Sequence, residues 1–203
     1  MAFMKTLKYL PLLLCGLLIG IIFLEILLRL FYWAGEQQVF GLKPMRTTIT
    51  WQDNPVVGKV LLSPSVQGWF VTPSKEYFSY IDANREGFYD QDHSINKPSN
   101  TYRILLLGDS FAASLQTTKD KTFGRQLENQ LNSLGLTQHF EVISIGMGDT
   151  GTAQQYLALK EFGLKYQPDL VIQMFLTAND LKNNYPELQR DPHRTYLKLE
   201  GDE

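Results

Sequence analysis

The sequence predicts an α/β protein in which one transmembrane helix precedes a three-layer α/β/α sandwich with a parallel sheet. Three observations lead to this prediction. A long apolar segment lies near the amino terminus, strand-like and helix-like segments alternate from residue 102 onward, and each predicted strand ends in a turn of small and polar residues. Strands that alternate with helices imply right-handed crossovers, and therefore a parallel sheet covered by helices on both faces.

The composition narrows the classes of partner and cofactor. The chain has 203 residues, of which 44% are hydrophobic, and a formal net charge of −2, which suits one ordinary domain and a small additional element. Charges of both signs are interspersed without a basic stripe, so we expect no nucleic-acid partner. The single cysteine, Cys15, excludes an intramolecular disulfide, and the three histidines form no dense metal-ligand cluster. We expect neither a metal nor an organic cofactor.

The apolar segment from residue 9 to residue 33 is predicted to be a membrane anchor. As one helix it would be about 37 Å long, which is enough to cross a tilted bilayer. Its two charged residues, Glu25 and Arg29, are four apart and can pair on one face near the membrane surface. A cleaved signal peptide would need small residues at its cleavage site, whereas Tyr32 stands at the −3 position before Ala34. We therefore expect the anchor to remain uncleaved.

The charges before this segment predict its orientation. Lys5 and Lys8 place positive charge on the amino-terminal side, and positively charged flanks stay in the cytoplasm. We expect residues 1–8 to be cytoplasmic, residues 9–33 to contact lipid as a single pass through the cell (inner) membrane, and the main domain to be periplasmic or extracellular.

Residues 34–99 are predicted to form an irregular, partly β linker region. Turn signals such as "GLKP", "DNP" and "VTPSKE" alternate there with short aromatic and β-branched segments, a pattern that indicates short strands and turns more than a helical stalk. The main domain is then expected to occupy residues 100–203.

Within that domain, strands and helices alternate. The apolar segments at residues 102–108, 140–146 and 169–176 predict buried strands, and the helical spacing of apolar residues predicts helices at 122–135 and 152–166. Ligands of parallel α/β sheets bind at the carboxyl ends of the strands. The turns "GDS", "GMGDTG" and "TAND", which follow the three strands, are therefore expected to meet at one edge of the sheet.

Ser110 is the candidate nucleophile at this edge. Gly108 permits a tight turn after the strand, which would place the Ser110 hydroxyl near the unpaired N–H groups of a helix start. The alternative is that Ser110 only caps that helix, because serine is a preferred capping residue.

The other two turns offer hydrogen-bond donors for a negatively charged oxygen. Asn179 follows the third strand, where its amide could complete an oxyanion hole with backbone N–H groups, although "ND" is also a common turn or helix cap. Gly146, Gly148 and Gly151 make the middle turn compact enough for a backbone N–H to approach, although a glycine-rich turn is also simply flexible.

Together, "LLGDSF", the glycine turn and "PDLVIQMFLTAND" resemble the SGNH (GDSL-type) hydrolase family, notably its membrane-anchored bacterial members. The resemblance covers about Tyr102 to Asn184. It implies an SGNH/flavodoxin-like fold and a serine esterase that hydrolyses carboxylic or acyl esters through an acyl-serine. The implied substrate is an ester-bearing small molecule, a lipid or an acylated glycan.

The resemblance also implies the roles of the site residues. Ser110 would be the nucleophile and would donate its backbone N–H as the first oxyanion contact. The second donor would be the backbone N–H of Gly148 or Asp149, and the third the side-chain amide of Asn179. Three further residues would support the turns: Gly108, Asp109 and Asp180.

Two departures from the family pattern bear on activity. Thr177 replaces a glycine in the G-x-N-D block, which leaves the asparagine in place. No D-x-x-H block, the family's source of the catalytic base, follows Ser110, and a serine without a base is a poor nucleophile at neutral pH. We expect the chain to be the amino-terminal part of a longer hydrolase, incomplete at its carboxyl end and weakly active or inactive by itself.

None of the three histidines is predicted to replace that base. "DQDH" places His93 three residues after Asp90, but before the nucleophile strand. His139 stands at the amino end of its strand, and His193 is expected to be a solvated loop histidine. Two alternatives to an esterase are an O-acyltransferase acting on a cell-envelope polysaccharide and a non-catalytic, anchored binding module. The sequence does not fix the substrate or the oligomeric state.

Overall fold

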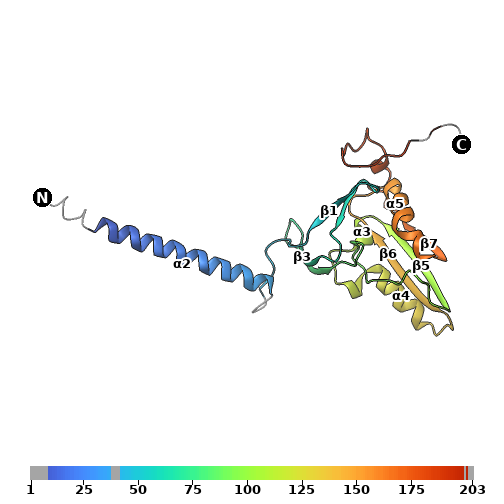
Figure 1. Cartoon of the computed structure of the whole chain (residues 1–203), viewed down its shortest axis with the longest axis horizontal. Coiled ribbons are helices and arrows are strands. Elements are labelled where there is room, and N and C mark those ends of the chain that lie inside the picture. Colours follow the sequence, from blue (N-terminus) through green and yellow to red (C-terminus); the bar gives the residue numbers. More distant parts are fainter. Residues whose placement is uncertain (1–8, 38–41, 199, 201–203) are drawn as a thin grey trace. The chain divides into compact units, whose positions relative to one another are not determined.

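The computed structural model describes residues 9–37, 42–198 and 200. The chain divides after Arg46 into two compact units. Among these residues, the first unit contains one long helix and the second, from Thr47, contains the strands (Figure 1). Residues 1–8, with the predicted cytoplasmic charges of Lys5 and Lys8, lie outside the described residues.

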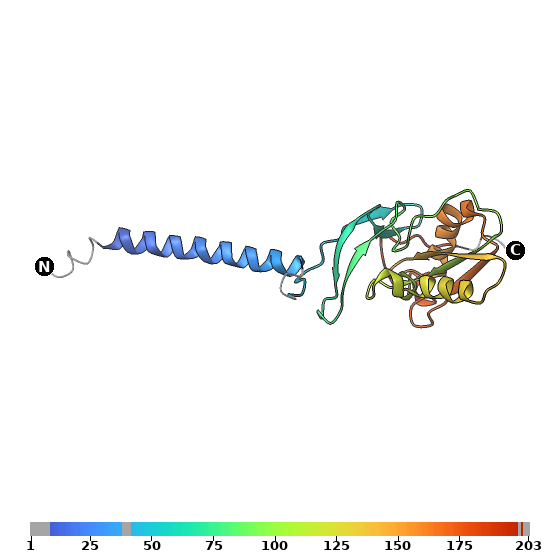
Figure 2. The same cartoon turned by 90° about the horizontal axis from the view of Figure 1, so that it is seen from below.

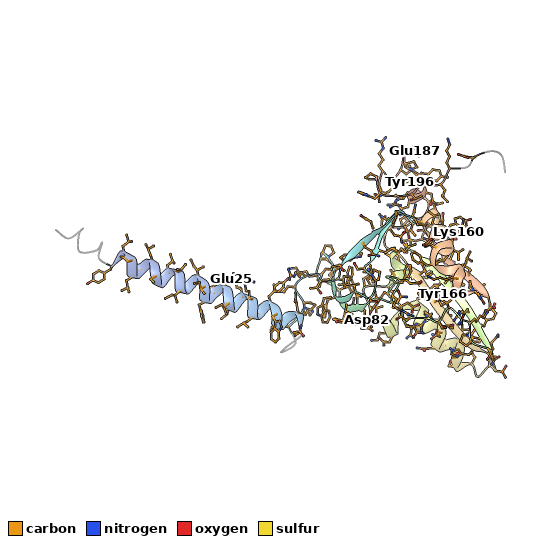
Figure 3. All side chains as sticks on the ribbon, in the orientation of Figure 1. Glu25, Asp82, Lys160, Tyr166, Glu187 and Tyr196 are labelled. Atoms are coloured by element: carbon orange, nitrogen blue, oxygen red, sulfur yellow. The ribbon has the colours of Figure 1, made fainter. Side chains whose placement is uncertain are left out.

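The helix of the first unit, α2, spans Leu10–Glu36. Pro11 lies in its first turn, where the missing N–H has no helical acceptor in any case. The helix has 27 residues and a mean hydropathy of 2.7 over its most apolar window, none of which is buried. Its side chains project outward along its length, with Glu25 paired to Arg29 at 2.8 Å (Figure 3). The unit therefore contains one apolar helix that is long enough to cross a bilayer.

The second unit is built around a three-stranded parallel sheet, in the order β6–β5–β7. β5 spans Thr101–Gly108, β6 spans His139–Gly146 and β7 spans Leu170–Met174. The register places Gly108 beside Gly146 on one side and beside Met174 on the other. The parallel sheet and the α/β class are confirmed, because helices follow β5 and β6 along the chain (Figures 1 and 2).

Helical segments contact both faces of the central strand. Leu105 and Leu107 of β5 pack with Ala158 and Tyr166, from the segment between β6 and β7. That segment comprises α5 (Thr152–Ala158), a π-helical turn (Leu159–Gly163) and a 3₁₀ turn (Leu164–Tyr166).

The alternate residues of β5 belong to a different cluster. Ile104 and Leu106 pack with Leu127 and Leu131 of α4, which spans Phe123–Ser133 between β5 and β6. Successive side chains of a strand point to opposite faces, so α4 and α5 contact opposite sides of β5.

The order of the strands creates a switch point after β5. The chain passes from β5 to β6 on one side and then returns to β7 on the other. In open α/β sheets, ligands bind at such reversals, outside the carboxyl ends of the strands. The residues that follow Gly108 at this position form a short helix, α3, which spans Ser110–Ala113.

Two antiparallel hairpins precede the sheet. β1 (Trp51–Asn54) pairs with β2 (Lys59–Leu62), and β3 (Gln67–Val71) pairs with β4 (Phe78–Asp82). The segment predicted as a linker region is therefore partly β from Trp51 onward. It also packs with the domain, because Val57, Leu61 and Phe88 share one buried cluster with Leu105.

Candidate active site

Asp109, not Ser110, caps the helix that follows β5. The Asp109 carboxylate is 1% exposed, and its Oδ1 accepts a hydrogen bond from the backbone N–H of Phe111 at 2.9 Å. Ser110 is the first residue of the helix, half-buried, and its hydroxyl makes no hydrogen bond with any group in the described part of the chain. The side chain of Ser110 is therefore not used for capping.

Two glycines allow α3 to lie directly on the strand ends. A Cβ atom on Gly146 would collide with the backbone of Ala113. A Cβ atom on Gly108 would lie 2.7 Å from the Ala112 Cβ and 3.1 Å from the Met174 Cβ. Contacts below 3 Å are sterically forbidden for real side chains, so glycine at these two positions sets the place of the serine turn.

The turn after β7 reaches the serine turn through Asn179. Its Nδ2 donates to Asp109 Oδ2 at 3.1 Å, while its Oδ1 is buried without a hydrogen-bond partner in the structure. The predicted donor therefore contacts the residue that precedes Ser110, and its N–H is directed to the carboxylate of that residue.

Asp180 stabilises the turn after β7 through hydrogen bonds to its buried carboxylate. It is fully buried, and its Oδ2 accepts hydrogen bonds from the Leu176 N–H at 2.9 Å and from Gln155 Nε2 at 3.5 Å. Its Oδ1 has no partner in the structure. Burial raises the pKa of Asp180, and the N–H of Leu176 and the Gln155 amide offset only part of this effect.

The loop after β6 carries the two alternative backbone donors, and they differ in conformation. Gly148 is exposed, and a Cβ added there would meet nothing within 4 Å. Asp149 has a φ of +52°, in the left-handed region that aspartate tolerates better than most residues. Asn183 Nδ2 donates to Asp149 Oδ1 at 3.2 Å and joins this loop to the turn after β7.

Two cations that the sequence analysis did not single out fix the Asp149 loop. Arg194 is buried and donates to the carbonyl oxygens of Asp149 at 3.0 Å and Asn183 at 3.1 Å. Lys59 of β2 contacts the Asp149 carboxylate at 2.9 Å and that of Asp191 at 3.1 Å. No pattern around Arg194 marks it as buried. The amide-rich "NDLKNN" after the third strand was the available signal for Asn183.

The start of α5 is tied to the same turn. Asn184 Oδ1 accepts a hydrogen bond from the Ala153 N–H at 3.0 Å, and its Nδ2 donates to Thr152 Oγ1 at 2.6 Å. A Cβ on Gly151 would lie 2.7 Å from Asn184 Oδ1. The three turns that follow β5, β6 and β7 are therefore joined by side-chain hydrogen bonds at one edge of the sheet.

His93 lies far from this edge. It is hydrogen-bonded to Asp90 Oδ2 at 3.1 Å and to Glu141 Oε1 at 2.7 Å, and its side chain is 1% exposed. Glu141 pairs in register with Arg103, five positions before the Gly108–Gly146 pair, or about 16 Å along the strands. Burial alone would lower the pKa of His93, but the bonds to Asp90 and Glu141 outweigh it and raise the pKa.

The other two histidines also make no contact with the serine turn. His139 is the exposed first residue of β6, at the opposite end of the strand from Gly146. His193 is exposed, and its backbone N–H donates to Asp191 Oδ1 at 3.0 Å. Among the described residues, no group of three or more histidine, cysteine or acidic side chains is placed to hold a metal ion.

No protein-family model matches the chain, and no curated protein matches it. Function is therefore inferred from the arrangement of the groups themselves. That arrangement places, at one edge of the sheet, a serine hydroxyl that bonds to no described residue, a side-chain amide and an exposed loop with backbone N–H groups. Groups of these kinds can attack a carbonyl and bind the oxyanion that forms.

Proposed function

We propose that the protein is a membrane-anchored serine esterase of the SGNH (GDSL) type, which hydrolyses carboxylic or acyl esters through an acyl-serine. The observation that carries the proposal is the joining of three turns around Ser110, by the Asn179–Asp109 and Asn183–Asp149 hydrogen bonds. The contacts of α4 and α5 with opposite sides of β5 support the three-layer sandwich that this family implies.

In this mechanism the Ser110 oxygen attacks the ester carbonyl carbon, and its proton passes to a base from solution, water or added imidazole, which returns it to the departing alkoxide. The alcohol then leaves, and water attacks the acyl-serine to release the acid and restore the hydroxyl. The backbone N–H groups of Ser110 and of Gly148 or Asp149 would bind the tetrahedral oxyanion. The amide of Asn179 would join them by exchanging its bond to Asp109 for one to the oxyanion.

The rate expected for this chain is low. No histidine of the described residues hydrogen-bonds to Ser110, and a serine hydroxyl needs a base to be a strong nucleophile. Oxyanion donors and substrate binding without a complete triad still give about 10³–10⁴-fold over the reaction in water. An added small base, such as imidazole, should therefore increase turnover.

The first experiment measures hydrolysis of a short-chain aryl ester by the full chain in lipid nanodiscs, with and without imidazole. A fluorophosphonate probe, located by peptide mass spectrometry, reports covalent attack separately. Wild type should be labelled at Ser110 and should gain turnover with imidazole above the reaction of imidazole alone. Ser110→Ala should lose both.

Ser114→Ala is the matched control. The Ser114 hydroxyl donates to the Phe111 carbonyl at the other end of the same short helix, so its removal should leave labelling and turnover unchanged. Equal behaviour of Ser110→Ala and wild type, or no labelling of either, would contradict the esterase and leave an anchored binding module. A product esterified to an added glycan would instead assign acyl transfer to a sugar hydroxyl.

The proposed location is the cell (inner) membrane, with residues 9–33 as a single pass and the main domain periplasmic or extracellular. The length and hydropathy of α2 support the span. A reporter fused after residue 203 that is active only outside the cytoplasm would agree with this orientation, and activity inside would overturn it.

A further inference from the structure

A cavity of about 380 Å³ lies beside the candidate site. Its lining includes Ala113, the last residue of α3, and Leu115, the residue just after the C-cap of that helix. Gly146, the last residue of β6, and Gly148, of the loop that follows, also line it. The same helix begins with Ser110, and the same loop carries the alternative backbone donors. The cavity therefore shares two walls with the site proposed for ester attack.

The β1–β2 hairpin and Tyr89 form the remaining sides. Trp51 and Leu62 stand opposite each other in the hairpin register, and both line the cavity with Leu61. The hairpin is held firmly, because Leu61 belongs to the buried cluster that includes Met147, another lining residue.

The ammonium and hydroxyl groups of the described lining residues are already hydrogen-bonded. Lys59 is their only charged residue, and its ammonium contacts the carboxylates of Asp149 and Asp191 at 2.9 and 3.1 Å. The Tyr89 hydroxyl donates to backbone carbonyls, those of Tyr80 and Thr117, each at 3.2 Å. The cavity thus presents apolar surface with no uncompensated charge, which favours an apolar and uncharged occupant.

We propose that this cavity binds the acyl chain of a neutral ester, with the carbonyl end directed toward Ser110. The inference rests on the proposed function, since it takes Ser110 as the nucleophile. The β1–β2 hairpin then acts as the element that selects the acyl group. A cavity of about 380 Å³ has the capacity for a chain longer than acetyl, because ligand pockets of roughly 300 Å³ upward hold small organic molecules.

The experiment uses the Ser110→Ala full chain in nanodiscs, so that binding is measured without turnover. The probe is a methyl hexanoate with a photoreactive diazirine at the end of its chain. After irradiation, peptide mass spectrometry should find the label on residues 51–62, 113–115 and 146–148. Excess methyl octanoate should abolish this labelling, whereas methyl acetate and an acetylated oligosaccharide should not.

Two variants test the position of the chain. Leu115→Trp fills the cavity and should reduce the labelling of these segments at least tenfold. Trp51→Ala removes a wall residue that is 43% exposed and should weaken labelling without affecting the fold. Leu134→Trp is the matched control, since Leu134 is exposed at the end of α4 and should leave labelling at the wild-type level.

A kinetic arm separates this inference from the function on which it rests. In the wild-type protein, kcat/KM should rise about fourfold for each methylene added between acetyl and hexanoyl esters. In the Leu115→Trp variant this rise should be smaller. Labelling of the cavity, with neither turnover in added imidazole nor fluorophosphonate labelling of Ser110, would retain the acyl site and overturn the esterase. Two results would overturn the acyl site and retain Ser110 as the nucleophile. One is turnover without chain-length dependence and without cavity labelling, and the other is displacement of the probe by the oligosaccharide.

Discussion

The side-chain amide of Asn179 donates to the carboxylate of Asp109 at 3.1 Å and so connects the turn after β7 to the residue that precedes Ser110. Asp109 uses its other oxygen to cap α3 at the Phe111 N–H. One buried carboxylate therefore positions both the serine helix and the amide proposed to bind the oxyanion. A change at Asp109 or Asn179 should therefore disturb both the position of Ser110 and the proposed oxyanion contact.

Replacing Asn179 by alanine is expected to lower ester turnover by about 10²–10³, the usual loss for one oxyanion donor. Steady-state hydrolysis of an aryl ester by the full chain measures this effect. Asn132→Ala is the control, because the Asn132 amide hydrogen-bonds the backbone of Phe140 at the opposite edge of the sheet. Wild-type turnover in Asn179→Ala would remove Asn179 from the oxyanion hole.

Gly146→Ala and Gly148→Ala are expected to differ in stability. A methyl group on Gly146 meets the backbone of Ala113, whereas one on Gly148 meets nothing within 4 Å. We expect Gly146→Ala to cost about 1–3 kcal/mol, as overpacking does, and Gly148→Ala to stay within about 0.5 kcal/mol of wild type. Urea unfolding in nanodiscs, followed by near-ultraviolet circular dichroism, distinguishes them, and equal midpoints would refute the close approach of α3.

Arg194→Leu is expected to destabilise the unit by about 3 kcal/mol. The substitution leaves the Asp149 and Asn183 carbonyls without their guanidinium donor, and an unsatisfied buried acceptor such as the Asn183 carbonyl costs about 1–3 kcal/mol. The melting temperature should fall by roughly 5–10 °C. Arg190→Leu is the control, because Arg190 is exposed; a similar fall in both variants would contradict the structural role of Arg194.

The stability of the sheet unit is expected to depend on the protonation of His93. Because contacts with Asp90 and Glu141 raise the pKa of His93 despite its burial, the folded protein binds this proton more tightly than the unfolded chain. The resulting stabilisation is complete below the unfolded pKa of about 6.5 and is lost as the pH rises through the raised folded pKa. The free energy of unfolding should therefore decline from about pH 6.5 upward, by at most about 1.4 kcal/mol per pH unit.

Glu141, which is hydrogen-bonded to His93, titrates below this pH window. The pKa of Glu141 is lowered, because Arg103 and His93 outweigh the opposing effect of burial, so its contribution is lost only as the pH falls through that lowered value. Arg103 pairs with Glu141, and Arg125 pairs with Asp90. His93→Gln should flatten the decline and His139→Gln should preserve it. Urea unfolding between pH 6 and 9 measures both.

The sheet and its helices were predictable because their signals are local. The apolar segments at 102–108 and 140–146 are long and bounded by turn residues, and they appear as β5 and β6 with small shifts at the ends. The apolar helix predicted at 9–33 appears as Leu10–Glu36 for the same reason. The helix predicted at 152–166 is also present, but its second half consists of a π-helical turn followed by a 3₁₀ turn. The spacing of apolar residues alone does not reveal this change of helix type.

The parts that escaped prediction depend on contacts between distant segments. Arg194 is buried only because two carbonyls from separate turns meet it. Lys59 reaches Asp149 across 90 positions of sequence. Hydropathy favours a surface position for both side chains. The β1–β2 hairpin had a turn signal, in which Asn54 accepts bonds from the N–H groups of Val56 and Val57, but its place beside the cavity follows from the packing of Leu61.

In the part of the chain that the structure describes, β7 pairs with β5 alone. Its other edge exposes backbone N–H and carbonyl groups, and the neighbouring apolar side chains of Leu170 and Val171 are 41% and 39% exposed, with Phe175 at 47%. An unpaired strand edge beside exposed apolar side chains is a template for strand addition. When no further strand covers this edge of β7, we expect the protein to self-associate through it at high concentration.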